Sequence, residues 1–147
     1  MNLKELNQLF QRDLEKLGQE LQAYTNEENL WIVDKEISNS AGNLTLHIFG
    51  NLRLFIGLDF GGIAYQRNRD FEFSGKGVPK FAMLEELEEV KKVVSTSLLG
   101  LNPIRMGDKS LHAMFGHQMS IGFFLIHLYG HMNYHIGQVN YHRRLLG

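Results

Sequence analysis

Hydrophobic residues recur every three or four positions along the first part of the chain, which is the repeat of an amphipathic α-helix. Lys, Glu and Gln cover the other faces of this predicted helix. The sequence TNEEN then breaks the repeat, and the next segment, LWIVDKEISNSAG, ends in polar residues suited to capping a second helix. The hydrophobic stripe consists of Leu3, Leu6, Phe10, Leu14, Leu17, Leu21 and Tyr24.

Two further stripes predict a second helix from about Asn43 to Asp59 and a third from about Lys80 to Leu98. A pair of glycines ends the second helix, and Pro79 suits the start of the third. The expected buried positions of the second helix are Leu44, Ile48, Asn51, Phe55 and Leu58, with His47 near the middle. Those of the third are Met83, Leu87, Val90, Val94 and Leu98.

The connection between these two helices, residues 61–78, is long for a compact domain. Loops of this length are usually functional or form interfaces. It carries Arg67, Arg69, Asp70 and Glu72, which could bind an anionic substrate. The favoured interpretation is that these residues form salt bridges across the loop or across a dimer contact.

The last helix is expected from about Ser120, or somewhat earlier, to Leu146, after the turn region GLNPIRMGDKS. Histidines four apart would share one face of a strand as well as of a helix, and the three glycines in this segment each cost a helix about 1 kcal/mol. Length decides for a helix, because more than twenty residues without a turn dipeptide is too long for one strand. We predict no strand pair, and an all-α four-helix bundle as a single domain over residues 1–147.

Composition narrows the function classes. The 147 residues are 44% hydrophobic and 21% charged, with a formal net charge of -1, so no overall field favours nucleic acid. The absence of cysteine excludes disulfides, thiolate metal ligands and a cysteine nucleophile. The N-terminus resembles neither a signal nor a transit peptide, and the longest apolar run, IGFFLIHLYGHM, falls short of the ~20 residues of a membrane span. We expect a cytoplasmic protein without a membrane segment.

The C-terminal sequence LYGHMNYHIGQVNYHRRLLG suggests a metal site. On a helix, His131 and His135 lie on one face about 5–6 Å apart, close enough for both imidazoles to bind one ion. His47, on the buried face of the second helix, is the expected third ligand. Considered alone, His47 is best interpreted as a core histidine with a satisfied hydrogen bond. Together with His131 and His135 it favours a metal site, because burying three imidazoles without partners would cost several kcal/mol. Three neutral ligands leave a coordination position open, as in a catalytic site.

The remaining histidines receive other roles. His127 lies one turn before the pair, where it is a neighbour of the site or part of the core. His142 is expected at the solvated, cationic end of the helix, where positive charge suits the helix dipole. His112 and His117 precede the helix and rank below the three predicted ligands.

Three residues are weak candidates for catalytic roles. Asn51 and Gln138 lie one turn from predicted ligands, where each amide could orient a ligand or substrate, or simply bond a backbone carbonyl. Tyr134, like Trp31, could form a pocket wall or belong to the core.

Two familiar metal motifs are absent. A His-Glu-x-x-His protease motif would need Glu where Met132 stands, and a di-iron bundle would need acidic residues, none of which follows Asp108. The predicted site is therefore rich in histidine and poor in carboxylates. Zn²⁺, Ni²⁺ and Fe²⁺ all suit imidazole ligands.

The segments NLTLHIFGNLR and HMNYHIGQVNYHRRL resemble the DinB/YfiT-like superfamily of metalloenzymes, whose signature is His-x-x-x-His-x-Gly-Gln with one histidine on the second helix. The GG..Y.R.RD.EF segment looks like one branch of it. The resemblance implies His47, His131 and His135 as metal ligands, an up-down-down-up helix order and a homodimer. Its members include thiol-dependent transferases and isomerases that use bacillithiol or mycothiol, and metal-dependent hydrolases.

The leading hypothesis is thus a metal-dependent enzyme whose open position takes water or the sulfur of a thiol cosubstrate, giving hydrolysis or transfer to an electrophile. The alternative is a non-catalytic, dimerising bundle in which a metal only joins the second and fourth helices. A third possibility is a bundle without metal.

Overall fold

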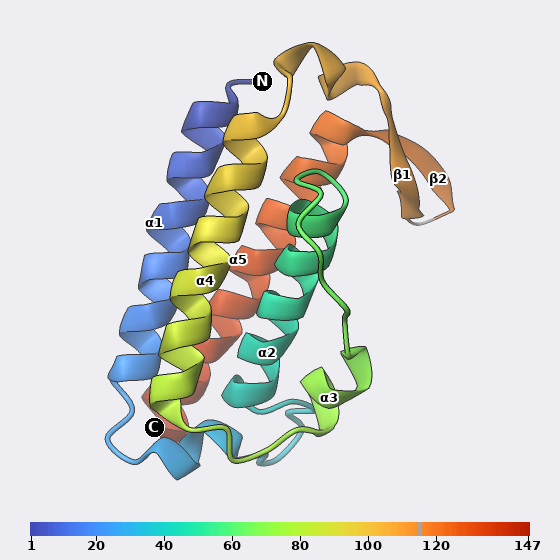
Figure 1. The fold of residues 1–147 in the computed structure, drawn as a ribbon. Helices are drawn as coiled ribbons and strands as arrows, with labels where there is room; N and C mark the ends of the chain where they lie inside the picture. Colours follow the sequence, from blue (N-terminus) through green and yellow to red (C-terminus); the bar gives the residue numbers. More distant parts are fainter. Residues whose placement is uncertain (115) are drawn as a thin grey trace.

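The computed structural model describes residues 1–114 and 116–147 and is mainly helical (Figure 1). The α-helices in the described residues are α1 Leu3–Gln22, α2 Ala41–Leu52, α3 Arg69–Ser74, α4 Lys80–Gly100 and α5 Ile121–Leu146. Short 3₁₀ segments span Glu27–Trp31 and Pro103–Gly107, and a π-helical segment, Arg53–Leu58, continues α2. The strands are β1 Lys109–Met114 and β2 His117–Ser120.

Four long helices, α1, α2, α4 and α5, lie side by side and enclose the core (Figure 1). Helix α1 packs against α4 and α5, and α2 packs against α5 and α4. All seven residues of the first predicted stripe, six in α1 and Tyr24 just beyond its end, are buried, as are all five in α4. They join side chains of α2 and α5 in one hydrophobic cluster, so the helical repeats read from the sequence do face a common core.

Side-chain caps set the starts of the two helices that carry the predicted ligands. The Ser40 hydroxyl accepts a hydrogen bond from the Asn43 backbone N–H, at 3.1 Å, and α2 begins at the next residue after Ser40. Likewise the Ser120 hydroxyl accepts from the Phe123 N–H, at 3.1 Å, at the start of α5. Each cap satisfies a backbone donor that the first helical turn leaves free.

The prediction of no strand pair is wrong. Strands β1 and β2 pair antiparallel and form a hairpin beside the upper end of α5 (Figure 1). Gly116 adopts a φ of +73°, which glycine tolerates without strain and which suits a chain reversal. The His112 ring holds the hairpin against the end of the π-helical segment, with Nε2 2.5 Å from the Asp59 carboxylate.

The long connection at residues 61–78 also contains an element that was not predicted, the short helix α3. Asn68 caps this helix by accepting a hydrogen bond from the Phe71 N–H. Within the described residues, no helix combines the length and hydrophobicity needed to cross a membrane.

Candidate metal centre

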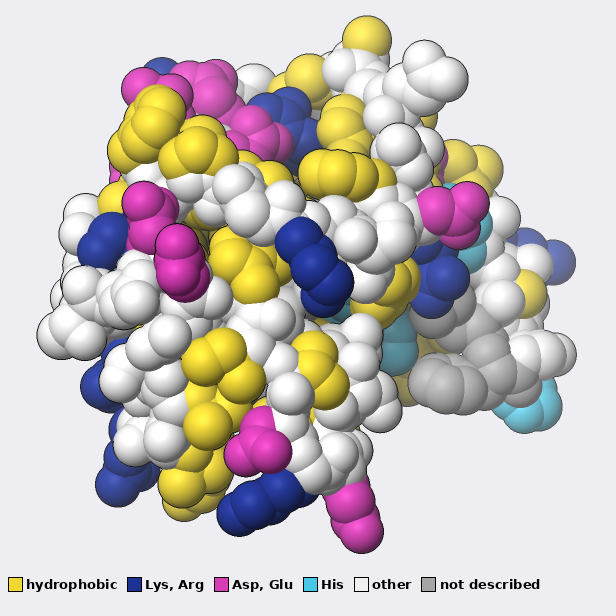
Figure 2. Space-filling model, turned by 90° about the horizontal axis from the view of Figure 1, so that it is seen from below, with side chains coloured by type: hydrophobic (Ala, Val, Ile, Leu, Met, Phe, Trp, Pro, Cys, Tyr) yellow, Lys and Arg dark blue, Asp and Glu magenta, His cyan; other side chains and the backbone are white. Residues whose placement is uncertain are grey.

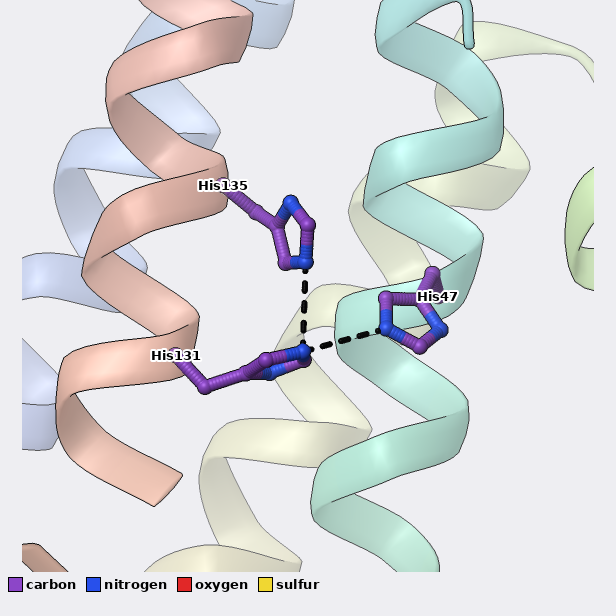
Figure 3. Close-up of side chains that lie close together, drawn as sticks. All are labelled: His47, His131 and His135. Carbon is purple, nitrogen blue, oxygen red and sulfur yellow. Dashed lines mark hydrogen bonds between the residues drawn. The ribbon is translucent and has the colours of Figure 1, made fainter. Parts of the chain in front are cut away.

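The structure brings His47, His131 and His135 together between α2 and α5 (Figure 3). His131 Nε2 lies 3.3 Å from His47 Nε2 and 3.2 Å from His135 Nε2. One nitrogen from each ring belongs to a set of atoms that all lie within 4.8 Å of one another. His47 is buried, whereas His131 and His135 are partly exposed.

These nitrogen spacings fit a shared divalent ion. For a tetrahedral ion with nitrogen ligands at about 2.0–2.1 Å, two ligand nitrogens lie about 3.3 Å apart. The two Nε2 separations from His131, 3.3 Å and 3.2 Å, agree with that geometry. The set also contains only imidazole nitrogens, which suit zinc, nickel and iron.

Hydrogen bonds on the opposite ring nitrogens fix the direction of two lone pairs. His47 Nδ1 lies 2.9 Å from the Glu72 carboxylate, and His135 Nδ1 lies 2.7 Å from the Gln138 amide oxygen. Both partners are acceptors, so each Nδ1 carries the proton, and the neutral form of each ring has its lone pair at Nε2. Arg67 Nη2 lies farther from His47 Nδ1, at 3.4 Å, and donates to the Glu72 carboxylate at 2.8 Å. The two Nε2 lone pairs converge on His131.

His131 cannot satisfy both neighbours as an ordinary hydrogen-bond partner. A proton on His131 Nε2 could form a hydrogen bond with the lone pair of either His47 Nε2 or His135 Nε2. The lone pair of the other ring would then have no hydrogen-bond donor. His131 Nδ1 is buried and has no hydrogen-bond partner among the described residues. A cation shared by the three Nε2 atoms resolves the arrangement, because it accepts all three lone pairs at once.

Burial favours the neutral form of two of the imidazoles, His131 and His135. Burial, together with the neighbouring His135 and His47, lowers the pKa of His131 to about 4. Burial also lowers the pKa of His135, despite the opposing effect of the Gln138 hydrogen bond. Rings that are neutral at pH 7 can bind a metal ion without first losing a proton.

A buried carboxylate orients His47 from behind. Glu72 is 4% exposed and receives two hydrogen bonds from Arg67, both at 2.8 Å, in addition to the His47 contact. Burial alone would raise the pKa of Glu72, but the hydrogen bonds from Arg67 and His47 outweigh it and lower the pKa. An ionised carboxylate on the far nitrogen of a histidine is a common support for a metal ligand.

Helix α2 provides the space and the anchor for this carboxylate. A Cβ at Gly50 would lie 1.9 Å from Glu72 Oε2, so only glycine leaves room there. The Asn43 amide donates to the backbone carbonyls of Glu72, at 3.0 Å, and Gly75, at 2.8 Å. These two hydrogen bonds hold residues 72–75 against the start of α2.

Sequence reasoning missed this role of Glu72. The expected salt bridge within the loop exists, because Glu72 pairs with Arg67. The contact of Glu72 with His47, however, joins residues 25 positions apart in different elements. No local pattern marks such a contact, although the charged residues inside an otherwise unexplained long loop were a general hint. The three clustered side chains are all histidines, but a carboxylate, Glu72, contacts one of them.

The weak candidates for catalytic roles lie in different environments. Gln138 contacts His135, as described above, and Asn51 is buried with its amide oxygen unpartnered among the described residues. Tyr134 is 66% exposed on the outer face of α5, its ring 5.4 Å from that of His135. Trp31 lies against Gly42 at the start of α2.

The expectation of a solvated His142 is wrong. His142 is 5% exposed, with Nε2 2.9 Å from the Ile32 carbonyl and Nδ1 2.6 Å from the Tyr24 hydroxyl. Since a carbonyl only accepts, Nε2 donates and Nδ1 accepts from Tyr24. These contacts with Tyr24 and Ile32 hold the ring inside the protein, and the next residue, Arg143, pairs with Glu20 on α1.

His127 is partly buried beside the cluster, as expected: its ring centroid lies 6.2 Å from that of His131, and it stacks on Phe124 at the same centroid distance. The remaining two histidines lie apart from the three clustered rings. His112 and His117 belong to the hairpin, where His112 bonds Asp59 and His117 is exposed.

These features define a mainly helical protein with a three-histidine cluster suited to a divalent ion. The chain belongs to the DUF1572 family, described as proteins of unknown function, whose family model matches residues 2–147. No curated protein matches the chain.

Proposed function

We propose that the protein is a metal-dependent enzyme in which His47, His131 and His135 hold one divalent ion. The observation that carries the proposal is the convergence of three Nε2 atoms, two of them with lone pairs directed by partners on Nδ1. A bound ion would act as a Lewis acid and lower the pKa of a coordinated water or thiol, which supplies the nucleophile for hydrolysis or for transfer to an electrophile. Zinc, nickel and iron are the candidate ions.

The finer fold assignment belongs to the same proposal. We infer a four-helix bundle of the DinB/YfiT-like type, in up-down-down-up order, with α3 and the hairpin as additions to it. The side-by-side packing of α1, α2, α4 and α5 supports it, as does the distribution of the three histidines over α2 and α5. The cytoplasmic location expected from the sequence stays a prediction.

Catalysis is favoured over a purely structural metal for two reasons. Three protein ligands leave a fourth position open, whereas structural sites are usually closed by four. His131 and His135 are also partly exposed, so a small molecule can reach the cluster. The alternative is a non-catalytic protein in which the ion only joins α2 to α5.

Cobalt substitution separates these two functions. We expect the full chain to bind one Co²⁺ and to show a visible spectrum that shifts when azide or an uncharged thiol, 2-mercaptoethanol, is added. A cobalt spectrum that neither ligand changes would support the structural alternative and contradict the enzyme proposal. His117→Ala serves as a matched control, because His117 is an exposed histidine outside the cluster and its loss should leave the response unchanged.

A homodimer is also part of the proposal, and one face of α5 supports it. Five large side chains, spaced by three, four, seven and eight residues, are 58–77% exposed there. Together they offer roughly 500 Å² of mostly apolar surface, against about 800 Å² that a typical partner buries. Sedimentation velocity should show Ile126→Arg as a monomer and the α4 control Leu99→Arg as a dimer. The five are Phe123, Ile126, Tyr134, Tyr141 and Leu145.

A further inference from the structure

A pocket of about 390 Å³ lies beside His135 at the C-terminal end of α5. Its walls are residues 36–39, the first turn of α2 and the last turns of α5. The volume falls within the range of about 300–1,000 Å³ typical of small-molecule sites. Figure 2 views this lower end of the molecule, where hydrophobic side chains gather between separate charged ones.

The pocket walls are mostly apolar. Hydrophobic side chains come from all three walls of the pocket. His142 also contributes to the lining, but both of its ring nitrogens already have protein partners, so it offers a ligand only its carbon edge. A ligand here would therefore be held chiefly by burial of apolar surface. The hydrophobic lining residues are Ile37, Leu44, Tyr141, Leu145 and Leu146.

The charges around the pocket disfavour an anion. Glu36 is the one charged side chain among the described lining residues, and no lysine or arginine lines the pocket. In the metal-free protein, a carboxylate or phosphate would lose water against apolar walls without gaining a lysine or arginine partner, and it would meet the negative charge of Glu36.

Polar groups line the pocket in two places: Ser38 and Asn39 on the wall of residues 36–39, and two residues where the pocket meets the histidine cluster. His135 and Gln138 both line it, and the Gln138 amide oxygen is used by His135 Nδ1. The amide nitrogen of Gln138 has no protein partner among the described residues and can donate a hydrogen bond to a ligand. A ligand acceptor, such as a carbonyl oxygen, fits at this end.

We propose that this pocket holds the substrate of the metal-dependent reaction, an uncharged and largely apolar molecule with a carbonyl-type acceptor near Gln138. The assignment as substrate rests on the proposed function, whereas the binding preference depends only on the pocket. An anionic thiol would not occupy this pocket and would have to approach the ion from elsewhere.

The preference is tested with two probes of the same skeleton, 4-phenylbutanamide and 4-phenylbutanoate. Metal-free protein, prepared with a chelator, is titrated with each and followed by two-dimensional NMR, so that the carboxylate cannot gain affinity by binding a metal. We expect the amide to perturb residues 36–39 and 141–146 and to bind about tenfold more tightly than the carboxylate. Equal or tighter carboxylate binding, perturbations elsewhere, or no binding of either probe would overturn the proposal.

A charge introduced at the rim supplies a second measurement. Ile37→Lys adds a cation to an exposed lining residue that lies outside the proposed dimer face, and it should reduce or abolish the preference for the amide. The matched control is Leu99→Lys on α4, which adds the same charge at an exposed leucine that does not line the pocket, and it should leave the preference unchanged. Equal effects of the two variants would contradict a site at this pocket.

The two proposals can fail separately. If the protein binds no metal but still selects the amide at the pocket, the pocket assignment stands and the enzyme proposal fails. If cobalt responds to azide but the probes do not bind at the pocket, the enzyme proposal stands and the substrate class is wrong.

Discussion

Replacing Glu72 by glutamine tests whether the carboxylate behind His47 supports the metal centre. Glutamine keeps the size of the side chain, which matters beside Gly50, but removes the negative charge. His47 Nδ1 then loses its ionised acceptor, and the guanidinium of Arg67, whose side chain is 12% exposed, loses its counter-charge. We expect metal affinity to fall about 10- to 100-fold.

The same change should lower stability without metal. Removing one partner of a buried ion pair costs about 3–5 kcal/mol, and because glutamine retains some hydrogen bonding we expect about 3 kcal/mol for Glu72→Gln. In a domain of this length, that corresponds to a fall in Tm of roughly 6–12 °C. Thermal unfolding of the metal-free protein, followed by circular dichroism, measures the loss of stability. Competition with a chromophoric chelator measures the metal affinity.

A second arginine–carboxylate pair provides the control. Glu86 pairs with Arg53 at 2.6 Å, but the Glu86 side chain is 39% exposed and the pair lies outside the histidine cluster. Glu86→Gln should therefore cost less than about 1 kcal/mol and leave metal affinity unchanged. If Glu72→Gln binds metal as tightly as the wild type, the carboxylate does not orient His47 and the reasoning is refuted.

Three further predictions concern the histidines and their supports. Gly50→Ala should displace the buried carboxylate and weaken metal binding in the chelator competition, whereas Gly130→Ala, which meets open space on α5, should leave it intact. Because the folded-state pKa of His131 is about 4, below its usual 6.5, the unfolded chain of metal-free protein takes up the proton first as the pH falls. Urea unfolding should therefore show stability lost between about pH 6.5 and pH 4, with a smaller loss in His131→Ala; equal losses would contradict it. Tyr24→Phe leaves His142 Nδ1 without its donor and should cost about 1 kcal/mol in urea unfolding. Its metal content should stay that of the wild type, and a decrease would show that His142 matters to the centre.

The long helices could be predicted from the sequence because their signal is local. Helices α1 and α4 are 20 and 21 residues long, and every residue of each predicted stripe is buried. The hairpin and α3 were missed because each segment has six residues or fewer, too short for a clear repeat. Their formation depends on contacts with the rest of the protein, such as the bond between His112 and Asp59.

In the candidate site, too, the features that depend on local sequence could be predicted, and those that depend on distant contacts could not. The spacing of His131 and His135 within one helix predicted their closeness, and His47 joined them as a histidine on another buried face. The opposite outcome for His142 has a clear cause: its partners, Tyr24 and Ile32, lie more than a hundred positions away. Charge and position at a helix end predicted solvation, but tertiary packing decided burial.

The metal content of protein purified without an affinity tag tests the central claim most directly. Elemental analysis should find about one divalent ion per chain in the wild type and in His117→Ala, and far less in His131→Ala. Wild-type protein that carries no more metal than His131→Ala, even after incubation with zinc, nickel or iron, would contradict a metal centre formed by His47, His131 and His135.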